Sequence, residues 1–202
     1  FQTQETIIEN MNTMFYADGT GNSNKDMLGL SVLVGDNTAT VGGIDSSDGD
    51  NDWWRSTIRN GPADSGPGAL AIATMGTLYN SVSVGNDQPT IIITDQTEYE
   101  AYEELLETNI RYTDTDLADG GFQNLLFKGA PVTFDSDTNL ATKMYFLNTK
   151  YIQLVAHSDV WFKPTPFVRP TNQDAVFSQL LCYGELTTSN RARQGLLRNL
   201  ND

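Results

Sequence analysis

Hydrophobic and polar positions divide the chain into a leading helix, a strand and helix unit in the middle, and a strand-rich last third. Apolar residues within 7–15 fall at helical spacing, and the glycines that follow Asp18 supply the stop expected beyond a helix end. Residues 28–34 form a short apolar run between glycines, which fits a strand and a buried connector equally well. Helical spacing returns over 69–82.

The clearest strand and helix pair lies at 88–107. A β-branched run after Pro89 predicts a buried strand within 88–95. Asp95, with Glu98 three residues later, resembles a capping box with Asp as the cap, so a helix is expected from there. Five glutamates of this helix are interpreted as a solvated face rather than as paired catalytic carboxylates. These are Glu98, Glu100, Glu103, Glu104 and Glu107.

The last third, residues 144–200, organises the chain. Aromatic and β-branched residues fill 144–157, and prolines arrive only in 161–170. This pattern predicts strands that enter a sheet, followed by an extended segment along an edge. A second long strand-like run covers 174–190, and residues 191–198 give it a basic tail.

Two stretches precede this last third. Residues 109–121 are polar and acidic, and we interpret them as a surface loop with Arg111 and Tyr112 as its only bulky pair. Residues 125–134 are expected to form two short strands about a Gly-Ala-Pro turn.

Composition bounds the class of protein. With 202 residues and 39% hydrophobic content, the chain can bury a substantial core as one large domain or two small ones. No stretch reaches the roughly 20 apolar residues that a membrane helix needs, so no membrane contact is expected. The single cysteine, Cys182, excludes an internal disulfide framework, and its apolar surroundings predict a buried thiol in a reducing cytoplasm.

The charge is strongly acidic and unevenly distributed. Residues 1–142 hold 5 basic and 22 acidic residues, a net charge of −17, whereas residues 143–202 hold 7 basic and 4 acidic ones, a net charge of +3. An acidic body repels a phosphate backbone, so specific nucleic-acid binding is disfavoured. Solubility explains much of the acid, and an acidic body with a basic end can also attract neighbouring copies.

An aspartate-rich stretch, residues 45–52, opens like a calcium loop. The motif then fails, because Trp53 stands where it demands glycine and Arg59 stands where it demands glutamate. A solvated turn is therefore expected, with no metal. Two adjacent tryptophans cannot both enter one core from a strand, so one of Trp53 and Trp54 is expected to anchor the loop and the other to meet a different element or subunit.

Catalytic chemistry is not expected. His157 is the only histidine, and no Gly-x-Ser-x-Gly elbow presents Ser158 or Ser178 as a nucleophile. A dyad of Cys182 with His157 is disfavoured, because both lie in strand-like apolar runs rather than at a strained turn. We therefore predict no enzyme activity, no catalytic residue, no cofactor and no metal site.

Several phrases along the chain occur in a recognisable order. They are Val41-Gly-Gly-Ile-Asp45, Trp53-Trp-Arg55, the helix at 98–107, residues 117–134, Phe146-Leu-Asn-Thr-Lys-Tyr151, Phe162-Lys-Pro-Thr-Pro-Phe-Val168 and Gly184-Glu-Leu-Thr-Thr-Ser-Asn-Arg191. This order resembles the major capsid proteins of tailed bacteriophages, the shell subunits of Hong Kong 97-type fold. Family members carry an N-terminal arm, an extended loop and most of a long spine helix ahead of the matching region, and this chain is expected to lack them.

The resemblance implies an α+β fold in three parts. Residues 1–65 would be the end of the spine helix with connecting strands and loops, 66–134 the axial domain at the capsomer centre, and 135–202 the peripheral-domain strands with the C-terminal segment. It also implies a virion protein, made in the host bacterial cytoplasm, that assembles into pentamers and hexamers of an icosahedral shell. The shell would enclose double-stranded DNA without reading its sequence.

Partners implied by the resemblance are further copies of the chain, with decoration, scaffold and portal proteins besides. Heterologous contacts are what closed rings of identical subunits require. Six residues are the candidates for these contacts: Trp53, Trp54, Arg55, Arg111, Arg191 and Arg193. Two alternatives stay open, an encapsulin-like compartment shell and an acidic ligand- or metal-binding module built on residues 45–52.

Overall fold

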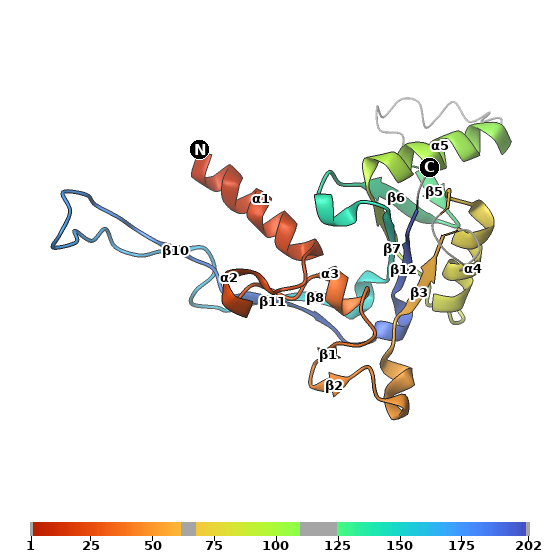
Figure 1. The fold of residues 1–202 in the computed structure, drawn as a ribbon, viewed down its shortest axis with the longest axis horizontal. Coiled ribbons are helices and arrows are strands. Elements are labelled where there is room, and N and C mark those ends of the chain that lie inside the picture. The colour runs from red at the N-terminus through yellow and green to blue at the C-terminus, as the bar shows by residue number, and fades with distance from the viewer. Residues whose placement is uncertain (1, 62–67, 110–124, 201–202) are drawn as a thin grey trace.

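A six-stranded sheet forms the centre of the molecule (Figure 1). The computed structural model describes residues 2–61, 68–109 and 125–200. The strands follow the order β3-β12-β7-β4-β6-β5. Their bounds are β3 Thr57–Asn60, β12 Gly195–Arg198, β7 Lys143–Leu147, β4 Ile91–Thr94, β6 Ala130–Phe134 and β5 Leu125–Phe127. Strand β12 runs parallel to β3, and β4 runs parallel to β6, whereas the other neighbouring pairs are antiparallel.

The interior strands of this sheet come from distant parts of the chain. The strand predicted within 88–95 is confirmed as β4, which lies between β7 and β6. Residues 191–198, expected as a basic tail, instead supply β12, which lies between β3 and β7. Leu196 and Leu197 are buried on its two faces, and that burial keeps the segment inside the sheet.

Both faces of the sheet are covered, and the alternation along β7 shows how. Met144 and Phe146 belong to a core cluster shared with helices α4 (Ile72–Val82) and α5 (Gln96–Asn109). Tyr145 and Leu147 point to the opposite side and join a second cluster shared with the N-terminal segment. Successive side chains of a strand face opposite ways, so one strand contributes to both layers of the core.

The helices on the first face begin close to where the sequence predicts. Helix α4 starts at Ile72 within the predicted 69–82. The Asp95 cap of α5 is confirmed, because the Glu98 amide donates to Asp95 Oδ1 at 3.0 Å. Glu98 itself is buried, so the prediction of five solvated glutamates is wrong at this position. Its side chain lies on the covered side of the first helical turn, whereas Glu100 and Glu104 are exposed.

The N-terminal segment covers the second face with short elements. The elements are α1 Gln2–Tyr16, α2 Gly21–Asn24, α3 Leu30–Leu33, β1 Thr40–Val41, β2 Ile44–Asp45 and the 3-10 helix η1 Gly49–Trp54. The predicted leading helix is confirmed as α1. Residues 28–34 form a buried connector with one helical turn, α3, rather than a strand. Gly29 is required there, because a Cβ at this position would lie 2.5 Å from the carbonyl oxygens of Met14 and Ala17.

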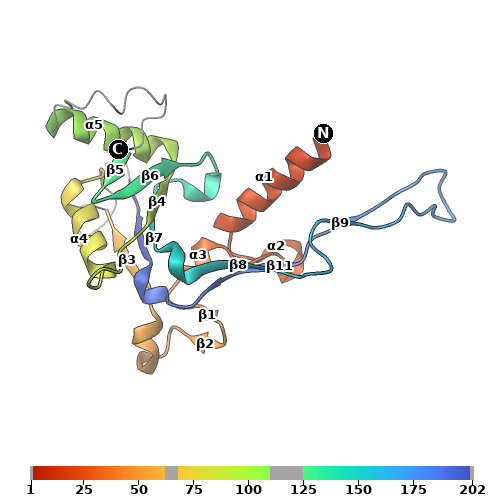
Figure 2. The same cartoon turned by 180° about the vertical axis from the view of Figure 1, so that it is seen from behind.

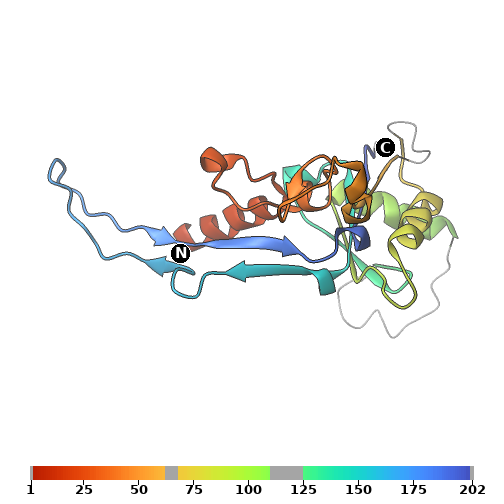
Figure 3. The same ribbon diagram turned by 90° about the horizontal axis from the view of Figure 1, so that it is seen from below.

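A long two-stranded hairpin, residues 152–188, leaves the body at one side, and we call it the arm (Figures 1 and 3). Its elements are β8 Ile152–Ala156, β9 Lys163–Pro164, β10 Leu180–Leu181 and β11 Gly184–Thr188. The predicted strand runs over 144–157 and 174–190 are confirmed as β7, β8, β10 and β11. Residues 161–170 are extended and pair with the returning strand of the arm, so the predicted edge is that of this two-stranded ribbon and not of the main sheet.

The two short strands β5 and β6 are confirmed, but the Gly-Ala-Pro turn is not, because the turn residues are Lys128 and Gly129, both with positive φ, and Ala130 and Pro131 belong to β6. The main sheet takes strands from each of the three parts 1–65, 66–134 and 135–202 that the resemblance implies. These boundaries stay a prediction. Residues 109–121 lie almost wholly outside the described ranges, so the loop expected there is not described.

Candidate assembly surfaces

In the outer part of the arm, residues 157–183, backbone hydrogen bonds join the two strands to each other. His157 N donates to Tyr183 O at 2.9 Å, and Thr165 N donates to Gln179 O at 2.8 Å. Val168 and Phe177 exchange two backbone bonds of 2.9 and 3.0 Å. The outer part of the ribbon extends far beyond the body (Figures 1 and 3), whereas at its base Ile152 and Leu186 pack in the second core cluster with the N-terminal segment.

Large apolar side chains are exposed along both strands of the arm. Phe167 is 79% exposed, and the other members of this set are between 39% and 59% exposed. The set is Leu154, Val155, Phe167, Val168, Val176, Phe177, Leu180 and Tyr183. An isolated two-stranded ribbon is marginally stable in water, and contiguous exposed apolar groups mark interaction sites. The arm therefore has the composition of a surface that another molecule covers.

The arm also differs from the body in charge. Residues 157–183 contain two basic residues, Lys163 and Arg169, and two acidic residues, Asp159 and Asp174. Their formal net charge is zero, whereas the whole chain carries −14. Like-charged bodies repel one another, so this uncharged outer part of the arm adds no net charge that would repel a second acidic copy.

The two adjacent tryptophans lie in different surroundings. Trp54 is 8% exposed in the second core cluster, and its indole N–H donates to Val41 O at 3.2 Å. Trp53 is 62% exposed, with its ring centroid 5.6 Å from that of Trp54. The prediction that only one indole anchors the loop is confirmed. The role of Trp53 in contacts between copies stays a prediction.

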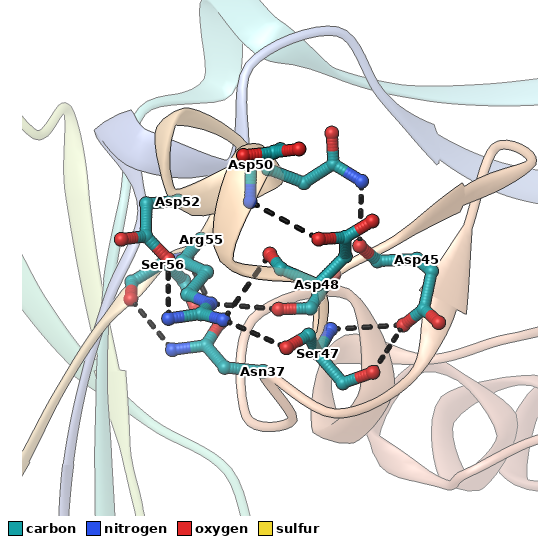
Figure 4. A network of polar contacts seen from close by, with 10 residues as sticks. Asn37, Asp45, Ser47, Asp48, Asp50, Asp52, Arg55 and Ser56 are labelled. Carbon is teal, nitrogen blue, oxygen red and sulfur yellow. Dashed lines mark hydrogen bonds and ion pairs between the residues drawn. The ribbon is translucent and has the colours of Figure 1, made fainter.

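The turn that carries these tryptophans is stabilised by its own side chains (Figure 4). Asp45 Oδ1 accepts from the amide and the hydroxyl of Ser47 at 2.9 and 2.7 Å. These bonds hold the pKa of Asp45 below its usual value. Asp48 Oδ1 accepts from the Asp50 amide at 3.1 Å. The aspartates thus satisfy their own backbone, as expected for a solvated turn.

Arg55 takes the position in this turn that a bound cation would need. Its Nε donates to Ser46 O at 2.7 Å, and its Nη2 donates to Ser47 O at 3.1 Å. Its guanidinium also pairs with Asp52 (Figure 4). The carbonyl oxygens that could bind a metal ion therefore already accept from an arginine. Among the described residues, no group of three or more His, Cys, Asp or Glu could hold a metal ion.

Arg191 lies inside the subunit and not on its surface. It is 0% exposed, and its Nε donates to Leu33 O at 2.7 Å. The remaining guanidinium nitrogens donate to Ser46 Oγ and to the carbonyls of Val32 and Asp36. Burial lowers the pKa of this guanidinium, and Asp36 partly offsets that effect. Arg191 therefore fixes the N-terminal segment on the sheet and offers no surface to a second copy.

The remaining candidates for contacts between copies are dispersed. Arg193 is 24% exposed at the base of the arm, where its Nε lies 4.0 Å from Asp87 Oδ2. Arg111 lies outside the described residues. Trp53 lies in η1, and Arg55 caps the end of that 3-10 helix. The apolar set of the arm was missed by sequence reasoning. A signal for it existed, since the prolines of 161–170 cannot donate the bonds that a covered central strand needs.

The nucleophilic side chains of the arm either form hydrogen bonds within the arm or are exposed to solvent. Cys182 is exposed, so the prediction of a buried thiol is wrong, because the arm has no second layer to cover it. His157 Nδ1 accepts from the Asp159 amide at 3.2 Å. Ser178 Oγ donates to Thr165 O at 2.6 Å. Every helix within the described ranges is too short or too polar to span a bilayer.

Comparisons by sequence find nothing, whereas comparison by structure finds a consistent set. No family model and no curated protein matches the chain. The capsid of cyanophage A-1(L) is similar with a TM-score of 0.68 and 21% identity, over 98% of this chain. The SrpI encapsulin of Synechococcus elongatus PCC 7942 gives 0.64 at 12% identity over 99%, and the procapsid of satellite phage P4 gives 0.52 at 12% over 99%.

These neighbours show the fold. The chain has the Hong Kong 97-type capsid fold, an α+β architecture, as the sequence resemblance predicted. It spans about two thirds of the length of the three neighbours, namely 66%, 64% and 63%.

Proposed function

We propose that this chain is a major capsid subunit that associates with copies of itself into the pentamers and hexamers of a phage head. The observation that carries the proposal is the arm, a ribbon with eight exposed apolar side chains and little net charge, on a fold shared with shell proteins. A second copy is the fitting occupant, because repeated contacts between different patches of identical subunits build rings and closed shells.

The proposed shell encloses double-stranded DNA without binding its sequence. The excess of acidic residues, 26 against 12 basic ones, supports a lining from which the phosphate backbone is repelled. Synthesis in the bacterial cytoplasm and contacts with decoration, scaffold and portal proteins belong to the same proposal. No enzymatic step is part of this role.

Light scattering on a sizing column, with negative-stain microscopy of the peak fractions, tests the self-association. Rings or megadalton particles are expected, and their amount should rise with protein concentration. A single species of 22.3 kDa at every concentration would contradict the proposal.

Matched variants locate the contact on the arm. Replacing Phe167 and Phe177 by serine should reduce assembly, because these side chains are 79% and 48% exposed and belong to the arm. The control replaces Val84 and Leu126 by serine, two side chains of the body that are 55% and 53% exposed. Equal loss of assembly in both double variants would show that exposed apolar area in general, and not the arm, drives association.

An encapsulin-like compartment shell is the second candidate, because the SrpI encapsulin shares the fold with a TM-score of 0.64. The two candidates differ in what the particle contains. Particles isolated from producing cells should protect double-stranded DNA from nuclease if the chain forms a phage head. Particles that contain a second protein and no DNA would support the encapsulin-like role.

A further inference from the structure

Two connectors join the arm to the body. The first runs from β7 to β8 through Asn148 and the 3-10 helix η4 (Thr149–Tyr151). The second runs from β11 to β12 through the 3-10 helix η5 (Arg191–Arg193). The connectors mark where the arm leaves the main sheet, because β7 and β12 are fixed in that sheet. The base of the arm also contacts the N-terminal segment, since the Leu28 backbone amide donates to Glu185 Oε1 at 2.8 Å and Leu186 is buried in the second core cluster.

The carboxylate of Asp87 meets both connectors. On the first, Asn148 Nδ2 donates to it at 2.9 Å, the Tyr151 hydroxyl donates to it, and Lys150 Nζ lies 3.8 Å away. On the second, Arg193 Nε lies 4.0 Å from Asp87 Oδ2. The Asp87 side chain is 25% exposed. A single carboxylate thus contacts both connectors.

The support that presents Asp87 is rigid. Val84 and Asp87 exchange two backbone hydrogen bonds of 3.0 Å and close the turn between α4 and β4. Gly85 occupies that turn at φ +59°, a left-handed conformation that glycine adopts without strain. A carboxylate on such a turn moves with the body and not with the arm.

The connectors are also joined to each other behind Asp87. The backbone amide of Asn148 donates to Gln194 Oε1 at 2.8 Å, and Gln194 Nε2 donates to the backbone carbonyl of Asn148 at 3.2 Å. Asn148 is 2% exposed, and Gln194 is 0% exposed. The two connectors therefore form one unit. The body contacts this unit through the carboxylate of Asp87, and through the carbonyls of Val32, Leu33 and Asp36 that accept from Arg191 of η5.

We propose that Asp87 is a positioning residue that sets the direction in which the arm leaves the body. The consequence for assembly rests on the proposed function: in a shell, the direction of the arm would fix where a neighbouring copy lies. Bonds from Tyr151 and Asn148, with Lys150 and Arg193 nearby, hold the pKa of Asp87 below its usual value. The carboxylate is therefore ionised at neutral pH, as the two cations require.

Distances between spin labels on the arm and on the body test the inference in the full chain. The exposed Cys182 is replaced by serine, and cysteines are introduced at Thr171 in the outer arm and at Ala73 on α4, both exposed positions. The parent should give one narrow distance distribution by double electron–electron resonance. Asp87→Ala should broaden the distribution and shift its mean, and Asp87→Asn should do so less because it keeps the shape.

Asp137→Asn is the matched control. Asp137 caps another short helix of the body, where its Oδ1 accepts from the Asn139 amide at 2.9 Å, and asparagine preserves that cap. An unchanged distribution in Asp87→Ala, or equal broadening in the control, would overturn the inference. If Asp87→Ala fails to fold by circular dichroism, Tyr151→Phe removes one donor to Asp87 and carries the same expectation.

Microscopy of the same variants separates the two proposals. Asp87→Ala particles should vary more in diameter than parent particles. Uniform particles with an unchanged arm distribution would overturn the inference and leave the capsid function standing. A parent that never assembles, while Asp87→Ala still shifts the arm, would contradict the capsid function and leave Asp87 as the residue that positions the arm.

Discussion

The body and the arm differ in how far their strands are covered by other elements. The six-stranded sheet of the body has helices α4 and α5 on one face and the N-terminal segment on the other, and its buried side chains form two clusters (Figure 2). The arm has two strands and eight exposed apolar side chains, and it packs against the body at its base, where Ile152 and Leu186 join the second cluster. The buried clusters account for the body, whereas a partner for the apolar set of the arm belongs to the proposed function.

Charge follows the same division. The arm between 157 and 183 is formally neutral, and the acidic residues concentrate in residues 1–142. Like-charged bodies repel one another, whereas contact through an uncharged ribbon carries no large cost of charge desolvation. Under the proposed function, stability and association therefore reside in separate parts of this fold, and substitutions should change one without the other.

The largest expected effect is on the stability of the body. Phe146 is a residue of β7, and its ring is 0% exposed in the first core cluster. Phe146→Ala removes this ring and should lower the free energy of unfolding by about 3 to 5 kcal/mol. Phe167→Ala removes a ring of the arm that is 79% exposed, and should change it by less than about 0.5 kcal/mol. Urea denaturation measures both, and a comparable loss in the two variants would remove the distinction between body and arm.

A smaller effect is expected at the buried arginine. Arg191→Met leaves the carbonyls of Val32, Leu33 and Asp36 without the donor that they have in the parent, and should cost about 3 kcal/mol. The matched change, Arg193→Met, removes a side chain with a weak ion pair and should cost less than about 1 kcal/mol. Equal midpoints in urea for the two variants would show that Arg191 does not hold the N-terminal segment.

Much of the body could be predicted from the sequence because local signals there agree with the tertiary environment. The β-branched run of β4, the Asp95 cap and the helical spacing of α1 each specify their element without help from distant residues. The fold itself followed from the order of several phrases. Residues 191–198 were misinterpreted, because four consecutive residues of a strand between two neighbours look like a short tail until the partners β3 and β7 are known.

The candidate surfaces were less accessible to sequence reasoning. Arginines are usually exposed, so Arg191 was counted as a surface group, although its carbonyl partners lie about 155 residues or more away in the chain. Apolar runs usually predict burial, so the arm around Cys182 was expected inside a core. The sequence contains the alternation of the arm but not the absence of a covering layer, which only the assembled fold reveals.

A pH effect is expected where arm and body meet. The pKa of Asp87 is lowered by its hydrogen bonds and by the neighbouring Lys150 and Arg193, so its contribution is present above the usual value of 3.8 and is lost as pH falls through the lower folded value. The label distances should therefore stay constant from neutral pH to about pH 4 and broaden below it.

Asp87→Asn removes this titration and should show no further change in the label distances over the same acid range. Circular dichroism at each pH verifies that the body stays folded, because Asp36 and Asp45 also have lowered pKa values and lose their bonds in the same direction. Acid broadening of equal size in Asp87→Asn would assign the change to those other carboxylates.

The smallest expected effect is none, at the acidic turn. A site that binds only the folded state must raise stability with ligand concentration, by about 2.7 kcal/mol when the ligand exceeds its dissociation constant a hundredfold. Arg55 already donates to Ser46 O and Ser47 O and pairs with Asp52, so calcium would have to displace a guanidinium from this turn. Melting temperatures with and without millimolar calcium should therefore coincide.

The variant Arg55→Ala frees the same oxygens. A calcium-dependent rise in the melting temperature of that variant alone would identify the arginine as the group that excludes the metal. A calcium-dependent rise in the melting temperature of the parent would instead favour the metal-binding module, and it would give the acidic turn a binding role besides its structural one.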